Sequence, residues 1–351
     1  MVLLCAAGPG TLARAGAPPG EPDSRAIGIQ LLEAPVARHD DPRALRYIVD
    51  HLPPGSTIKR KISVVNHSAE RRRLDLFAAG ADVADGRFRF AEGRTANELS
   101  GWITLDEDSV TLDPQESIRF TATVRVPREA SAGERYAVVW ASTVPARNAS
   151  ANVNIVHRVG VRVYLDVGPG GEPPSDFAIG DVVPARDGGG RPSVDVTVRN
   201  TGGRALDMGG SATLSDGPGG IRAGPFDVVQ GTTLAAGEAG TVRVIFPAEL
   251  ANGPWRIALE LASGKVRRSA SGTITFPDPG QAGRRTPLLD RLTQNRWLRG
   301  GVLAVAAVAV AGVALLIRRL RRRRAAVHAA GQMAHAAGHV AVSSTGSDIR
   351  K

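Results

Sequence analysis

The feature that most constrains this chain is an uninterrupted apolar run near its C-terminus. Residues 300–317 (GGVLAVAAVAVAGVALLI) contain no charged residue and no proline. At 1.5 Å rise per residue, an α-helix over this run would be about 27 Å long, which matches the hydrocarbon core of a bilayer. The run therefore predicts a single transmembrane helix.

The residues on either side of this run predict its orientation. Trp297 precedes it, where an indole ring favours the membrane interface, and a block of arginines follows it at once. Because positive flanks stay in the cytoplasm, we expect residues 1–299 outside the cell and an Arg-rich tail, residues 318–351, inside it. The chain is thus expected to be a type I, single-pass protein of the cell membrane. The arginines expected to anchor it are Arg318, Arg319, Arg321, Arg322, Arg323 and Arg324.

The net charge of +10 does not indicate a nucleic-acid-binding protein, because it is concentrated at the two membrane flanks. Residues 318–351 carry +7 and residues 281–299 carry +4, which leaves −1 for residues 1–280. Positive flanks of this kind attract the anionic headgroups of a bilayer, whereas a nucleic-acid surface needs the excess charge on the folded domain. The expected partners therefore include the lipid bilayer and exclude nucleic acid.

The N-terminal segment, residues 1–25, is interpreted as the remnant of a signal peptide. It begins with a short apolar stretch, residues 2–7 (VLLCAA), and continues with small residues that suit cleavage, such as Ala13 and Ala15. Cys5 is the only cysteine of the chain, so an intrachain disulfide and a cysteine-based metal site are excluded. The extracellular part must therefore be held together by its hydrophobic core.

Alternation of apolar and polar residues before the membrane segment predicts an all-β fold. Residues 117–126 (SIRFTATVRV) and 193–199 (SVDVTVR) have this period of two, which is typical of strands with one face in a core. No sustained helical period occurs before residue 300. We therefore expect two tandem Ig-like β-sandwiches followed by a single transmembrane α-helix.

Composition sets the expected domain boundaries. A Gly/Pro linker at residues 168–175 separates a first sandwich, residues 26–167, from a second, residues 176–276. Residues 277–299 are expected to form a juxtamembrane spacer, which leads into the membrane helix at residues 300–317.

The two sandwich sequences look like copies of one plan. Asn66 ends an apolar strand in the first as Asn200 does in the second, and Thr111-Leu112 corresponds to Thr233-Leu234. Repeated landmarks in the same order predict two copies of one fold.

No set of residues with catalytic spacing stands out in this sequence. The histidines at positions 39, 51, 67 and 157 are scattered, and no serine lies in a nucleophile-elbow context. We therefore expect no enzymatic activity, no cofactor and no metal site.

Residues 94–102 (RTANELSGW) combine an aromatic ring with arginine, amide and carboxylate groups. Such groups are typical of surfaces that bind carbohydrate or protein, because stacking faces lie beside hydrogen-bonding partners. Arg94, Asn97, Glu98 and Trp102 are therefore candidate ligand-binding residues. The alternative is that Trp102 fills the core and the polar groups only fix the loop.

Four segments together resemble a known family, DUF916, also called the peptidoglycan-binding domain of WxL-interacting proteins. They are residues 47–55 (YIVDHLPPG), 65–68 (VNHS), 95–102 (TANELSGW) and 132–141 (AGERYAVVWA). The resemblance implies an extracellular Ig-like sandwich on a Gram-positive surface, then a second sandwich, a transmembrane helix and a basic tail. It implies that the first domain contacts peptidoglycan and the second a WxL protein or host matrix. It also adds Tyr136 and Trp140 to the candidate ligand-binding residues.

The sequence therefore predicts a membrane-anchored cell-surface protein whose ectodomain binds cell-wall peptidoglycan or a secreted surface protein. The bias toward Ala, Arg and Gly resembles that of an actinobacterial sequence. The alternative function is an accessory or sensor subunit that docks onto another membrane protein complex.

Overall fold

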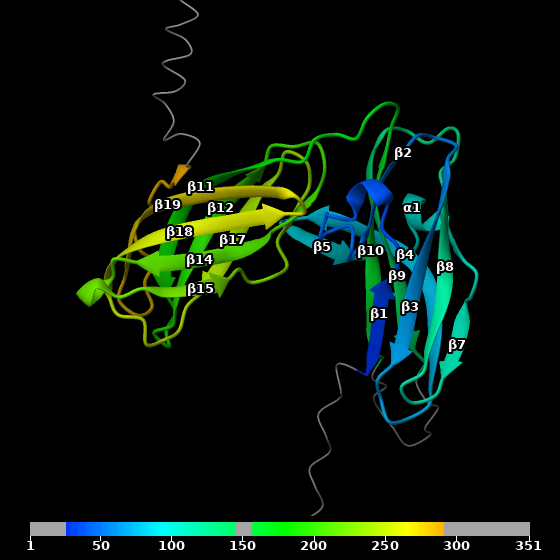
Figure 1. The fold of residues 1–351 in the computed structure, drawn as a ribbon, viewed down its shortest axis with the longest axis horizontal. Helices are drawn as coiled ribbons and strands as arrows, with labels where there is room; N and C mark the ends of the chain where they lie inside the picture. The colour runs from blue at the N-terminus through cyan, green and yellow to red at the C-terminus, as the bar shows by residue number, and fades with distance from the viewer. Residues whose placement is uncertain (1–25, 145–155, 291–351) are drawn as a thin grey trace, which may run out of the picture. The chain divides into compact units, whose positions relative to one another are not determined.

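The computed structural model describes residues 26–144 and 156–290, whose regular secondary structure consists almost entirely of β-strands (Figure 1). The one α-helix in these residues is α1 (Glu98–Gly101), a single turn. Two 3-10 turns, η1 (Val36–Arg38) and η2 (Pro218–Gly220), complete the helical structure of the described ranges. The predicted all-β class is thus confirmed for the part of the chain that the structure describes.

The membrane segment predicted from the sequence, residues 300–317, lies outside the described residues. So do Trp297, the arginines of residues 318–324 and the signal-peptide remnant at residues 1–25. Among the residues that are described, no helix is both long and apolar enough to cross a bilayer.

The first sandwich is built from a four-stranded and a six-stranded sheet. The four-stranded sheet has the order β1 (Ile27–Leu31), β3 (Thr57–Asn66), β8 (Ser117–Arg125), β6 (Ile103–Leu105). The six-stranded sheet has the order β2 (Ile48–Leu52), β10 (Arg158–Val167), β9 (Gly133–Thr143), β4 (Arg72–Ala84), β5 (Arg87–Phe90), and β7 (Ser109–Leu112) also pairs with β4. Neighbouring strands run antiparallel except β2 and β10, which are parallel.

Side-chain alternation places one face of each sheet in a shared core. In β3, Ile62 and Val64 are fully buried, whereas Lys61 is exposed. Val139 of β9 and Val163 of β10 meet them from the six-stranded sheet. Burying each such side chain contributes about 1.5–3 kcal/mol, so this core stabilises the sandwich without a disulfide.

The second sandwich is also built from two packed sheets, but their strand numbers and orders differ from those of the first. One sheet has the order β11 (Phe177–Arg186), β12 (Pro192–Asn200), β17 (Ala239–Ile245). The other contains, side by side, β15 (Ala223–Asp227), β14 (Gly209–Ser215), β18 (Gly253–Ser263) and β19 (Val266–Phe276). The remaining strands are the pair β13 (Leu206–Asp207) and β16 (Thr233–Leu234), and β20 (Leu289–Asp290).

Trp255 of β18 is the largest fully buried side chain of the second core. It is 1 % exposed, and its indole N–H donates to the carbonyl of Ala251 at 3.0 Å. A buried indole needs such an acceptor, because an unpaired N–H group in a core is costly. The loop before β18 is therefore fixed to the core.

Asn66 and Asn200 occupy equivalent positions in the two sandwiches, and each donates to three backbone carbonyls at equivalent places. Both are fully buried. The side-chain amide of Asn66 donates to the carbonyls of Glu70, Leu112 and Asp113 at 2.7, 3.1 and 3.1 Å. The side-chain amide of Asn200 donates to the carbonyls of Arg204, Leu234 and Ala235 at 2.7, 3.1 and 3.0 Å. The similarity between the two sequences thus corresponds to a shared hydrogen-bond pattern.

Arg204 joins the two sandwiches, which belong to one compact unit ending at Leu288. It extends from the second sandwich, is 1 % exposed, and forms ion pairs with Glu134 at 3.8 Å and with Glu172. It also donates to the carbonyl of Asp50 at 3.3 Å. Burial lowers the pKa of Arg204 to about 10, although Glu134 opposes this shift. The side chain stays charged at neutral pH and ties the second sandwich to the first.

The chain continues along the second sandwich after β19. Within residues 280–286, Thr286 exchanges two backbone hydrogen bonds of 2.9 Å with Val182 of β11. Leu288 packs against the second core. The first part of the segment expected to be a spacer, residues 277–299, is thus attached to the second sandwich.

Candidate binding surface

The six-stranded sheet of the first sandwich is apolar on both of its faces. Leu76 and Val139 point into the core, whereas their neighbours Phe77 and Trp140 lie on the opposite, outer face. An antiparallel sheet with one solvated face normally alternates apolar with polar residues. An apolar outer face therefore indicates a surface that is shielded from water. Arginine side chains shield one part of this face.

We call this part the arginine–aromatic face and define it as Phe77, Phe90, Arg94, Trp140 and Arg158. Strand register brings its rings together, because Phe77 of β4 pairs with Trp140 of β9. The ring of Phe90, from β5, meets the indole of Trp140 edge-on with centroids 4.8 Å apart. Edge-to-face packing at this distance is favourable for aromatic rings.

Both arginines of this face lie over aromatic rings. The guanidinium of Arg94 lies 4.3 Å from the ring centroid of Phe77, and its Nη2 donates to Asp75 at 2.5 Å. The guanidinium of Arg158 lies 5.2 Å from Trp140 and 5.5 Å from Phe77. Such contacts are cation–π interactions, and they hold both guanidinium groups in place before any ligand arrives.

A ligand that approaches this face meets the guanidinium groups and one ring first. Phe77 and Trp140 are only 9 % and 7 % exposed, whereas Phe90 is 46 % exposed. Arg94 and Arg158 are both exposed. The indole N–H of Trp140 is buried and has no acceptor among the described residues. The face thus offers charged donors over an apolar base.

Gly160 makes room for the indole of Trp140. The two residues are opposite one another in the β9–β10 pair. A Cβ atom at position 160 would lie 2.6 Å from Cε3 of Trp140 and 2.7 Å from Cγ2 of Val138. Real Cβ atoms do not approach other atoms this closely, so only glycine allows the ring to lie flat across β10.

We expect Gly160→Ala to displace the indole and to lower the free energy of unfolding by about 1–3 kcal/mol, the usual cost of overpacking. Urea unfolding followed by circular dichroism would measure the loss, and near-ultraviolet circular dichroism would report the moved indole. Gly188→Ala is the matched control, because a Cβ at that position meets nothing within 4 Å. Equal stability of the two variants would contradict the close approach.

Asn97, a predicted ligand-binding residue, holds its own loop in place. It caps the N-terminus of α1, where its side chain accepts from the backbone N–H of Ser100 at 2.9 Å. Its amide also donates to the carbonyls of Tyr136 at 2.7 Å and Ala81 at 3.2 Å. These partners use the hydrogen-bonding groups of the Asn97 side chain, so its role in this structure is to attach α1 to β4 and β9.

The other predicted residues lie beside α1 or toward the second sandwich. Trp102 is half-buried against the first core, and Arg135 lies over its ring and pairs with Glu98 at 2.8 Å. The hydroxyl of Tyr136 donates to Glu134 at 2.9 Å. Burial raises the pKa of Tyr136, with Glu134 adding to the shift, so this hydroxyl remains a donor.

The structure therefore brings together Arg94 and Trp140 of the six predicted residues. Phe77, Phe90 and Arg158 complete the face and were not among the predicted residues. One signal for Arg158 exists in the sequence, because β10 alternates Arg158, Gly160 and Arg162 with core valines. Two arginines and a glycine at alternate positions of one strand indicate an outer face with a purpose other than solvation.

No protein-family model and no curated protein matches this chain. Solved structures that resemble it include bacterial chaperones. The E. coli chaperone DraB is 13 % identical, with a TM-score of 0.32 and coverage of 69 % of this chain and 94 % of DraB. The Pseudomonas aeruginosa CupB2 chaperone is 11 % identical, with a TM-score of 0.34 and coverage of 66 % and 99 %.

A further similar chain comes from the Salmonella enterica SafA pilin in complex with the SafB chaperone. It is 9 % identical, with a TM-score of 0.36 and coverage of 69 % of this chain and 94 % of that one. Similarity at this level carries no argument about function. The assignment of Ig-like sandwiches rests on the strand pairing and the two cores described above.

Proposed function

We propose that this chain is a membrane-anchored cell-surface protein whose arginine–aromatic face binds cell-wall peptidoglycan. One observation carries the proposal: two guanidinium groups are held over aromatic rings on the apolar outer face of a sheet. The resemblance of the first sandwich to DUF916 domains supports the same ligand.

The chemistry of this face suits a polymer of sugars and peptides. Sugar rings present C–H groups that pack on aromatic side chains such as Phe90, and the peptides carry carboxylates that pair with guanidinium groups. Because Arg94 and Arg158 are already held in place, little side-chain freedom is lost when a carboxylate binds. Each contact is weak by itself.

Membrane anchoring would strengthen such weak binding. The apolar run at residues 300–317 and the arginines after it support an anchor that keeps the ectodomain close to the wall. Tethering raises the effective concentration of one partner near the other, so several weak contacts give a stable attachment.

We expect the double substitution Arg94→Ala with Arg158→Ala to weaken binding to peptidoglycan about tenfold or more, because two charged donors are lost. The measurement is a pull-down of purified residues 26–290 on insoluble peptidoglycan sacculi, with the retained fraction followed over protein concentration and salt. Both side chains are exposed, so the fold should persist.

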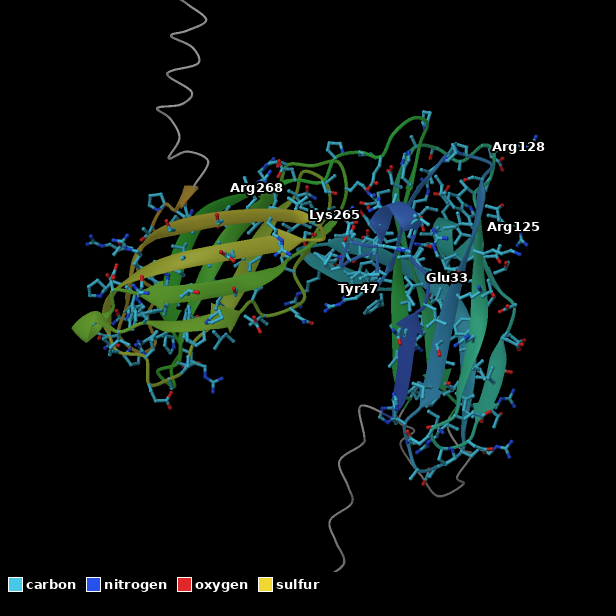
Figure 2. The ribbon with its side chains drawn as sticks, viewed as in Figure 1. Glu33, Tyr47, Arg125, Arg128, Lys265 and Arg268 are labelled. Carbon is cyan, nitrogen blue, oxygen red and sulfur yellow. The ribbon has the colours of Figure 1, made fainter. Side chains whose placement is uncertain are left out.

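Arg125→Ala is the matched control, since Arg125 ends β8 in the opposite sheet of the same sandwich (Figure 2). Its retention should equal that of the unaltered protein. Unchanged retention of the double variant would remove the arginine–aromatic face from the proposal. Absence of retention at every salt concentration would favour a secreted or membrane protein as the partner, to be identified by crosslinking on intact cells.

A further inference from the structure

A cavity of about 360 Å³ lies where the two sandwiches meet, and it is lined by none of the residues of the arginine–aromatic face. From the first sandwich it is lined by Pro42, Arg43, Arg46 and Tyr47, which precede β2, and by Arg162 of β10. From the second sandwich it is lined by β13, the start of β14, residues 230–233 and the turn between β18 and β19. Figure 2 labels Tyr47, which lines the cavity, and Lys265, which lies in that turn.

The charged residues that line this cavity are four arginines and one aspartate. The arginines are Arg43, Arg46, Arg162 and Arg267, and the aspartate is Asp207. The lining therefore carries a net charge of +3. A concave surface with charges of one sign concentrates ions of the opposite sign, so the cavity attracts anions.

Asp207 does not repel such an anion strongly, because donors occupy both of its oxygens. Oδ2 accepts from Nε of Arg43 at 2.6 Å. Oδ1 accepts from the hydroxyls of Tyr164 at 2.7 Å and Thr233 at 2.9 Å, and from Arg162 at 3.2 Å. Burial opposes the charge of Asp207, but Arg43 and these hydrogen bonds hold its pKa below the usual range. The carboxylate is an internal fixing point for the arginines.

Arg43 is built into the cavity wall with donor capacity left over. The residue is 8 % exposed, and its guanidinium lies 4.0 Å from the ring centroid of Tyr164. Its Nη2 is buried and has no hydrogen-bond partner in the described part of the chain. Buried donors are normally paired, so this unsatisfied nitrogen is unusual, and its positive charge adds to that of the cavity wall.

Arg46 and Arg267 approach the same cavity from different sandwiches. Both are exposed, and neither forms an ion pair with any residue that the structure describes. Two long, unpaired side chains at the opening are able to close over an anion that has entered. Arg43 and Arg162 form the fixed part of the site, and Arg46 and Arg267 form the adaptable part.

We propose that this cavity binds the phosphate group of a ligand. The net lining charge of +3 attracts anions, and guanidinium groups match phosphate oxygens in a bidentate geometry. The cavity is large enough for a phosphate and its attached carbon groups. A neighbouring cavity of about 700 Å³ shares Arg162 and residues 230–232, so a longer phosphodiester has space to continue.

The test uses the full-length protein in detergent and isothermal titration with three probes at equal ionic strength. The probes are inorganic phosphate, the phosphodiester glycerophosphoglycerol and the dicarboxylate malonate. We expect phosphate or the diester to bind more tightly than malonate. Arg46→Gln and Arg267→Gln should each weaken that binding about tenfold, because a charged donor is lost in each.

Arg191→Gln, in the exposed turn between β11 and β12, is the matched control and should bind as the unaltered protein does. Tighter binding of the diester would support a phosphodiester polymer as the source, and tighter binding of inorganic phosphate would support a small phosphate compound. Equal binding of malonate, or equal weakening by Arg191→Gln, would show general charge attraction and overturn the site. Neither arginine contacts the arginine–aromatic face, so this outcome is independent of the sacculus experiment.

Discussion

Replacing Asp207 by asparagine is expected to lower the free energy of unfolding by about 3–5 kcal/mol, the usual result of breaking a buried ion pair on one side. In the unaltered protein Asp207 raises the pKa of Arg43 against the effect of burial. In the variant Arg43 would still keep its charge, because a guanidinium is ionised at any ordinary pH. The variant would leave that buried charge unpaired, since an amide cannot replace the carboxylate that accepts four hydrogen bonds.

The effect depends on pH in a defined direction. The pKa of Asp207 is lowered in the folded protein, so its contribution is complete above the ordinary aspartate range and is lost as pH falls through the folded pKa. The stability difference between the unaltered protein and Asp207→Asn should therefore be constant near neutral pH and shrink below about pH 4. Urea unfolding of residues 26–290 at several pH values would measure it.

Asp195→Asn provides the control for this substitution. Asp195 pairs with Arg243 at 2.6 and 2.7 Å on the surface of the second sandwich, and such exposed pairs contribute about 0.2–1 kcal/mol. An equally small loss of unfolding free energy in Asp207→Asn would mean that water enters the space between the two sandwiches and replaces the carboxylate. The account of Asp207 as the fixing point of the cavity would then be untenable.

Asn66→Ala and Asn200→Ala are each expected to lower the free energy of unfolding by about 3 kcal/mol or more. Each substitution removes the donor for three backbone carbonyls that lie in or near a core. Because the hydrogen-bond patterns are the same, the two losses should be similar. Hydrogen exchange would show the first sandwich opening in one variant and the second in the other.

A loss below about 1 kcal/mol in either variant would contradict this expectation, because it would show that water satisfies the carbonyls. A large loss in one variant alone would show that the two sandwiches use the asparagine differently despite the shared pattern.

Many of the strands could be predicted from the sequence alone, because the alternation of apolar and polar residues is a local pattern. The period of two in residues 117–126 and 193–199 corresponds to strands β8 and β12. Asn66 and Asn200 were visible as landmarks, but their hydrogen bonds were not. Those bonds join positions 46 and 34 residues apart, and strand pairing over such distances is set by packing.

The candidate site was predictable only in part for the same reason. Arg94 was predicted from the chemistry of its loop, and Trp140 from a family resemblance. The side chain of Asn97, in the same loop as Arg94, is already hydrogen-bonded within the domain. From the sequence alone, Phe77 would be assigned to the core. Only its strand register with Trp140 places it on the outer face. The contact between Arg43 and Asp207 joins residues 164 positions apart, in different sandwiches, so no local sequence pattern predicts it.

The segment that leaves the second sandwich covers an edge at which two copies of the chain could associate. An edge strand such as β11 presents unpaired backbone groups, to which the edge strand of a neighbouring molecule is able to add. Residues 280–286 take up part of that edge through their own hydrogen bonds. With the membrane anchor proposed above, copies of the chain would meet often in one plane. The stretch that leads toward that proposed anchor would then also protect the second sandwich against strand-by-strand aggregation.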